Sequence, residues 1–153
     1  MPSGGGQAYR FPNNATPPGS AAYYCIRFGA RQGHPELALL FAWRTEVRRI
    51  QEQHRDPGVA RLKLDWWRRE IDASLQGRAH HPLAQALTTP MRVHQLPLQP
   101  FTQLLDAAEA DVLGQPIADD TELWAHCEQT GGGFAELLTR VAGGADRRLL
   151  EQA

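Results

Sequence analysis

The sequence predicts an all-α protein, a bundle of about six helices, and two observations lead to that prediction. Apolar residues recur at steps of three and four through most of the chain beyond residue 34, which is the spacing of one helix face. No stretch of useful length alternates apolar and polar residues, and no Asn-Gly turn separates apolar runs, so hairpins are not expected. With 153 residues, the chain is long enough for one domain with a core.

The N-terminal part should change from coil to helix near residue 21. Residues 1–20 are rich in Gly, Pro, Asn and Ser and offer little apolar surface to offset their ordering entropy. We therefore expect a flexible leader over residues 1–20, followed by a helical domain over residues 21–153. The aromatic residues within 21–30 would also suit a strand, but the rest of the chain is helical, so we expect a short first helix there.

The second helix should run from Pro35 to about His54. Arg48 and Arg49 lie near its C-terminal end, where basic side chains complement the helix dipole. One apolar seam should face the core, and it is formed by Leu40, Trp43, Val47 and Ile50, widened by Leu37 and Phe41.

The third helix should begin at Asp56-Pro57, since Asp caps free N–H groups and Pro fits the first helical position, and it should end at Gly77. Because its apolar residues occupy two neighbouring faces, we expect it to lie between other helices. Trp66 and Trp67 should be core anchors, and stacking on a ligand is the alternative. The two faces are Val59, Leu62 and Trp66, and Leu64, Trp67, Ile71 and Leu75.

Prolines and glycines set the bounds of the next two helices. The fourth should start at Pro82 and break or kink at Pro90, which lacks the N–H that a helix interior needs. The fifth should follow Pro100, keep the helical period through Val112 and stop at Gly114.

The sixth helix should start at Asp119 or Asp120, with Glu122 placed as a capping-box partner of Asp119. It should end at Gly143, and residues 146–153 read as the start of another helix. Its expected buried stripe is Leu123, Cys127, Thr130, Phe134, Leu137 and Val141.

Three consecutive glycines, Gly131, Gly132 and Gly133, fall inside this sixth helix. Each glycine costs about 1 kcal/mol relative to alanine in a helix interior, so the run needs a reason. Two interpretations stay open: a neighbouring helix approaches closely here, or the glycines form the wall of a ligand site.

Composition narrows the class of protein. The 16 basic and 17 acidic residues nearly balance, so we expect no nucleic-acid partner. Cys25 and Cys127 are far apart without metal-ligand spacing, and we interpret them as buried, reduced thiols of a cytoplasmic protein. The chain has no signal-peptide pattern and no run of 18 apolar residues, although it could still rest on the inner membrane face.

Catalytic motifs such as GxSxG, HExxH, the P-loop and GxGxxG are absent from the sequence. One acidic cluster, Asp106, Glu109 and Asp111, could bind a metal, because Asp106 and Glu109 share a helix face. Two such carboxylates could hold Mg²⁺, with waters and a substrate diphosphate completing the shell. The alternative is an ordinary solvated helix face.

From about residue 17 to residue 144 the order of motifs resembles the squalene/phytoene synthase family, which are all-α head-to-head prenyl transferases. The resemblance implies the N-terminal half of an isoprenoid-synthase-type helical bundle. The matching motifs are Tyr23-Tyr24-x-x-Arg27-Phe28, Leu40-Phe41-Ala42-Trp43, Lys63-Leu64-x-Trp66-Trp67-Arg68-x-Glu70-Ile71, His81-Pro82-Leu83-Ala84, Leu105-Asp106-Ala107-x-Glu109-x-Asp111, Leu123-x-x-x-Cys127 and Gly131-Gly132.

The family's activity needs two aspartate-rich motifs that hold Mg²⁺ on the prenyl diphosphate. The first, of the DDxxD type, aligns with residues 48–52, where Arg48 and Arg49 replace both leading aspartates and only Glu52 keeps an acid. The second would follow Gly143, in a region that we expect to lie beyond the end of this chain. The pattern is similar to a non-catalytic branch of the family, which resembles a complex I assembly factor.

We therefore expect a diverged family member without prenyl transferase activity that binds a prenyl diphosphate, a membrane lipid, or a protein partner covering an exposed apolar face. Arginines could bind a diphosphate without metal. The alternatives are an active isoprenoid synthase that uses Mg²⁺, with Glu52 as a metal ligand, and a structural remnant. The expected substrate-binding residues are Phe41, Arg44, Arg48, Arg49, Gly131 and Gly132.

Overall fold

The computed structural model describes residues 9–53 and 56–143, and within these ranges all regular structure is helical. This confirms the all-α prediction. Six helical segments result, as expected, because α1 continues into η1 and α6 continues through η2 into α7. The elements are α1 (Ala21–Tyr24), the π-helical turn η1 (Cys25–Gly29), α2 (His34–Gln53), α3 (Pro57–Leu75), α4 (Pro82–Val93), α5 (Gln99–Val112), α6 (Asp120–Cys127), the π-helical turn η2 (Glu128–Gly132) and α7 (Gly133–Val141).

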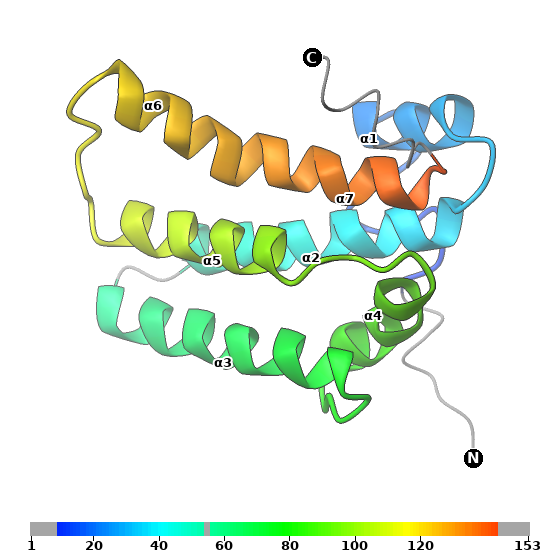
Figure 1. Ribbon diagram of the computed structural model, residues 1–153, viewed down its shortest axis with the longest axis horizontal. Helices are drawn as coiled ribbons and strands as arrows, with labels where there is room; N and C mark the ends of the chain where they lie inside the picture. The colour runs from blue at the N-terminus through cyan, green and yellow to red at the C-terminus, as the bar shows by residue number, and fades with distance from the viewer. Residues whose placement is uncertain (1–8, 54–55, 144–153) are drawn as a thin grey trace.

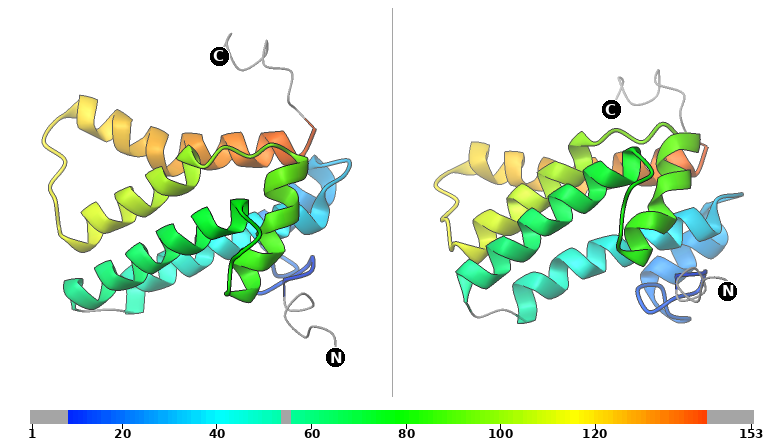
Figure 2. Two further views of the ribbon diagram at one scale, coloured as in Figure 1. Left: turned by 60° about the horizontal axis from the view of Figure 1, so that its bottom comes forward. Right: turned by 90° about the horizontal axis from the view of Figure 1, so that it is seen from below.

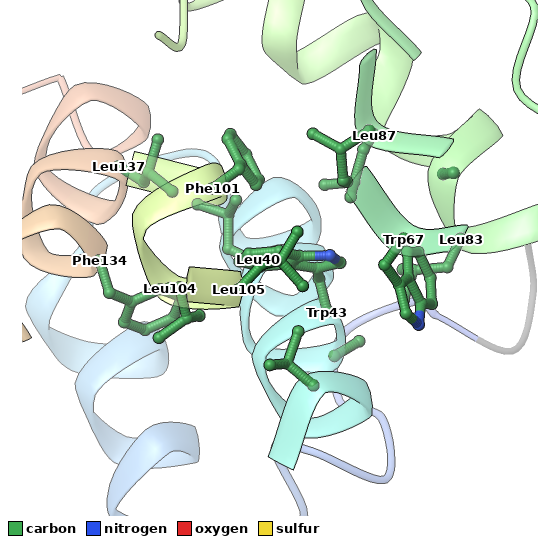
Figure 3. Packing of buried hydrophobic residues seen from close by; sticks show 14 of the residues in the cluster. Leu40, Trp43, Trp67, Leu83, Leu87, Phe101, Leu104, Leu105, Phe134 and Leu137 are labelled. Atoms are coloured by element: carbon green, nitrogen blue, oxygen red, sulfur yellow. The ribbon is translucent and has the colours of Figure 1, made fainter. Parts of the chain in front are cut away.

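Four long segments run side by side along the molecule: α3, α2, α5 and the continuous α6–η2–α7 segment (Figure 1). Helix α4 crosses one end of this array against α2 and α3, and α1 lies at the end where α7 finishes (Figure 2). The core lies among α2, α3, α4, α5 and α7. Figure 3 shows its centre, where the buried rings of Trp43 and Phe101 meet edge to face with centroids 4.8 Å apart.

The predicted N-caps Asp56 and Asp119 are confirmed, whereas the Glu122 carboxylate accepts a hydrogen bond from the Ala118 N–H at 2.8 Å rather than from the expected Asp119 N–H. The Asp56 carboxylate accepts a hydrogen bond from the Gly58 N–H at 2.8 Å, and the Asp119 carboxylate accepts one from the Glu122 N–H at 2.9 Å. Gly77 has a φ of +67°, a left-handed conformation that suits glycine after a helix. Pro90 does not break α4, which continues to Val93, and the alternative of a kink at Pro90 stays a prediction. Pro90 is buried, so its packing offsets the missing N–H.

The N-terminal segment differs from the predicted leader. Residues 1–8 lie outside the described residues, but residues 9–20 pack onto the bundle. Thr16 is fully buried, and the Asn13 side-chain amide donates to the Ala38 carbonyl oxygen in α2 at 3.0 Å. The rings of Tyr9 and Phe11 contact the core cluster. Composition alone missed this, because two aromatic rings and one Asn turn supply enough contacts to order a Gly- and Pro-rich segment.

Helix α3 is covered on only one of its two apolar faces, which corrects the expectation that it lies between helices. Leu64, Trp67 and Ile71 are buried, whereas Val59, Leu62 and Trp66 are exposed, Leu62 by 69 %. Leu75, at the end of the covered face, is exposed as well, and of the two expected core anchors only Trp67 is buried. Helix α3 forms an edge of the array in Figure 1, so its outer face has no neighbouring helix among the described residues. The sequence analysis expected an exposed apolar face that a protein partner could cover. The outer face of α3 is a candidate for that face, and the partner stays a prediction.

The predicted stripe along the sixth helix is buried only in its C-terminal part, at Phe134, Leu137 and Val141. Leu123 and Cys127 are exposed because α6 diverges from α5 (Figure 1), and α6 itself contains no buried residue. The expectation of two buried thiols is therefore wrong, since Cys25 is exposed as well. The helix expected over residues 146–153 lies outside the described residues.

Candidate functional site

One face of α2 organises the candidate site. Leu37, Phe41, Arg44 and Arg48 follow each other at steps of four, three and four, so their side chains project to one side of the helix. Apolar residues lie toward the N-terminal end of this face and cationic residues toward its C-terminal end. The face is bordered by η1, α7 and α5, all of which contact α2 or one another.

An apolar groove of about 290 Å³, open to solvent, lies at the N-terminal end of this face, between η1, α2 and α7. We call it the apolar chamber. Ile26 and Leu37 are its buried lining residues, and Phe41 is a half-buried part of its lining. Its complete lining is Cys25, Ile26, Gly29, Ala30, Leu37, Phe41, Leu138, Thr139 and Ala142.

Aromatic rings and a cation follow the chamber along α2. The Phe41 and Phe134 rings meet edge to face with centroids 5.3 Å apart, and the Arg44 guanidinium carbon lies 4.7 Å from the Phe134 centroid. Burial, and then the charge of Arg48, lowers the pKa of Arg44 from its ordinary value. Arg44 forms no ion pair with any residue of 9–53 or 56–143. It is therefore a partly desolvated cation, positioned to attract an anion.

A smaller cavity of about 90 Å³ lies next to Arg44, between α2, α5 and η2. Arg48 borders it and pairs with Glu52 one turn further along α2, at 3.1 Å. On the opposite wall, the Gln51 side chain donates to the Asp111 carboxylate at 3.0 Å. The cavity is lined by Arg44, Val47, Arg48, Gln51, Leu104, Ala108, Asp111 and Thr130.

Arg49 lies away from this cavity, although the sequence suggested it beside Arg48. Neighbouring helical residues point about 100° apart, so Arg49 faces the side of α2 nearer to α3 and pairs with Glu46 at 2.8 Å. It lines a groove together with Trp66 and Trp67. Arg48 and Arg49 therefore do not converge on one anion, and Arg44 is the second cation beside Arg48.

The glycine run has two different environments. A Cβ on Gly133 would lie 3.3 Å from the Pro100 Cβ, so close helix packing explains this position. A Cβ on Gly131 would meet nothing within 4 Å, and one on Gly132 would come no closer than 3.9 Å to Glu128. Gly132 lines a separate, largely polar cavity that includes Glu128 and Glu136. Packing thus accounts for one glycine of three, and the acidic cavity beside Gly132 does not suit a diphosphate.

The acidic cluster on α5 is bound by arginines from α3. The Arg68 guanidinium lies 2.7 Å from the carboxylates of both Asp106 and Glu109, and Arg61 lies 2.8 Å from Glu109. Hydrogen bonds from Arg68 lower the pKa of Glu109, burial opposes the change, and Arg61 adds to it. These residues form a clamp between α3 and α5. The sequence had suggested either a Mg²⁺ site or an ordinary solvated helix face, and the clamp is neither.

The residues present do not fit the family's Mg²⁺ site. Glu52, the acid retained in the first motif, is exposed and paired with Arg48. Across residues 9–53 and 56–143, no group of three or more His, Cys, Asp or Glu side chains is placed to hold a metal ion. The described residues therefore offer no carboxylate site for Mg²⁺ of the kind that the family uses.

Sequence reasoning missed Leu138 as a residue that lines the apolar chamber. Phe134 had been placed in the buried stripe, and Leu138 lies one turn further along, where it faces the chamber. The sequence held a signal for Leu138, because it lies four residues after Phe134 and therefore on the same side of α7.

Within the described part of the chain, no helix is both long and apolar enough to cross a membrane.

Comparison with known protein families matches residues 16–153 to the model of squalene/phytoene synthase. No curated protein matches the chain, and no solved structure matches it. The family match covers the whole site described above.

Proposed function

This chain belongs to the squalene/phytoene synthase family, and we propose that it binds a prenyl diphosphate along α2 without the metal-assisted ionisation that prenyl transfer requires. A prenyl diphosphate has an apolar chain and an anionic head, and the α2 face has the same order of chemistry. The chain would occupy the apolar chamber. The head would lie against Arg44 and Arg48, which can donate several N–H groups to phosphate oxygens.

The observation that carries this proposal is the partly buried position of Arg44 between the chamber and the smaller cavity. Its guanidinium lies over the Phe134 ring and has no carboxylate partner among the described residues. A cation in such a place attracts an anion more strongly than a solvated surface arginine does. The Phe41–Phe134 pair would separate the apolar chain from the charged head.

The absence of ionisation is argued from the charges at the first motif. A diphosphate departs as an anion only when its developing charge is neutralised, and the family does so with Mg²⁺ held by carboxylates. Arg48 and Arg49 occupy the leading positions of that motif here, and Glu52 is paired with Arg48. This favours a binding protein over the alternative of an active synthase.

Replacing Arg44 by methionine should weaken binding of a thiodiphosphate analogue of farnesyl diphosphate about ten-fold or more, because a hydrogen bond to a charged group contributes about 1.5–3 kcal/mol. Isothermal titration calorimetry in EDTA measures the dissociation constant without metal. Arg69→Met is the matched control, since Arg69 is exposed on α3 and has no ion pair with a described residue. Equal affinity in the two variants, or no saturable binding to the wild type, would contradict the proposal.

A further inference from the structure

We infer that the α1–η1 segment is a docking surface for an anionic membrane. Two large aromatic side chains on this segment face solvent: Phe28 is 76 % exposed and Tyr24 is 52 % exposed. Their rings stack on each other, with centroids 6.1 Å apart and planes 16° apart, so together they form one continuous apolar patch. Side chains of this size are usually buried, and a contiguous exposed patch indicates an interaction site.

The positive charge around this patch indicates that its partner is anionic. From Tyr9 to Pro35 the chain contains Arg10, Arg27 and Arg31 and no acidic residue, although the whole protein carries a net charge of −1. All three arginines are exposed, and none pairs with an acidic side chain in the described ranges. The next acid along the chain, Glu36, is only partly exposed.

Exposed aromatic rings beside unpaired arginines match the interface of an anionic bilayer. Aromatic rings enter the boundary between headgroups and acyl chains, and each basic residue near an anionic surface adds attraction. The segment lies at one end of the molecule (Figure 1), so a flat bilayer can reach it. Its nine residues are short for a helix that binds a protein groove, which favours the bilayer as the occupant.

The docking surface adjoins the apolar chamber, because Cys25, Gly29 and Ala30 of the same stretch line that cavity. Docking would hold the chamber next to the lipid phase, where prenyl chains partition. Only this role of docking in supplying a prenyl chain to the chamber rests on the proposed function. Docking itself rests on the exposed rings and the arginines, and it can be measured with no prenyl ligand present.

The test is flotation of the full chain with vesicles of phosphatidylcholine alone or of phosphatidylcholine with phosphatidylglycerol. The wild type should float with the anionic vesicles. Arg27→Gln and Arg31→Gln should each weaken binding about five-fold, which corresponds to about 1 kcal/mol per basic residue near an anionic surface. Phe28→Ser should weaken it about ten-fold through lost apolar burial. High salt should reduce binding of the wild type.

Two controls match these variants on another face. Leu62→Ser removes an exposed apolar side chain from α3, and Arg69→Gln removes an exposed arginine, so both should bind anionic vesicles like the wild type. The inference is overturned if the wild type does not float with anionic vesicles, if it floats equally with neutral ones, or if Leu62→Ser loses as much binding as Phe28→Ser. Each of these results leaves the calorimetric test of Arg44 unaffected, so the two proposals can fail separately.

Discussion

Replacing Glu70 by alanine should lower the free energy of unfolding by about 3 kcal/mol, because two backbone N–H groups would lose a charged acceptor worth about 1.5–3 kcal/mol each. Glu70 lies on α3 and is only 5 % exposed. Its carboxylate accepts hydrogen bonds from the N–H groups of His80 and His81, both at 2.9 Å. His81 is the N-cap of α4, so Glu70 fixes the turn that joins two core helices. Urea denaturation of the purified variant measures this loss.

The same carboxylate makes stability depend on pH. Burial raises the pKa of Glu70, but the hydrogen bonds from His81 and His80 lower it more, so the folded pKa lies below the ordinary value. Its contribution is therefore complete above the ordinary carboxyl pKa and is lost as pH falls through the folded pKa. Glu70→Gln should show a flatter fall of stability with acid than the wild type. Parallel curves would refute this assignment.

Replacing Arg68 by methionine should cost about 2 kcal/mol, more than the 0–1 kcal/mol of an ordinary surface ion pair. Its side chain is 25 % exposed and binds three carboxylates: Asp65 on its own helix at 2.6 Å, and Asp106 and Glu109 on α5. Burial lowers the pKa of Arg68, but hydrogen bonds to these acids more than compensate and raise it. Without Arg68, the acids of α5 would repel each other beside α3.

Arg61→Met is the matched comparison for Arg68→Met in the same thermal or urea denaturation. Arg61 is 54 % exposed and contacts only Glu109 of this acidic cluster, so its removal should cost under about 1 kcal/mol. A loss at Arg61 equal to that at Arg68 would show that the clamp contributes no more than two independent surface pairs. In that case the clamp would not contribute specially to the packing of α3 against α5.

The elements were predictable because their signals are local. Asp56 and Asp119 satisfy free N–H groups within three residues of themselves, and Gly77 and Gly114 adopt positive φ directly after a helix. Which apolar face becomes buried depends instead on where the neighbouring helices lie. Leu62 and Leu64 are both apolar residues of α3, yet only Leu64 faces another helix.

The candidate site was predictable only in part. The apolar period predicted the helix that carries Arg44 and Arg48, the family alignment placed Arg48 in the first motif, and the helical period places both arginines on one side. The separation of Arg49 from Arg48 follows from the same geometry once the neighbours of α2 are known. The pairing of Arg68 with Asp106 spans 38 residues of sequence, and no local pattern specifies it. The acidic cluster therefore looked available for metal until its partners on α3 were known.

Binding without catalysis can be tested by incubating the wild-type chain with farnesyl diphosphate and Mg²⁺ and measuring the diphosphate released. We expect the thiodiphosphate analogue to bind in calorimetry and diphosphate release not to exceed that of the protein-free control. Mg²⁺-dependent release that disappears in Glu52→Ala would contradict this expectation, because Glu52 would then serve as a metal ligand rather than as the partner of Arg48.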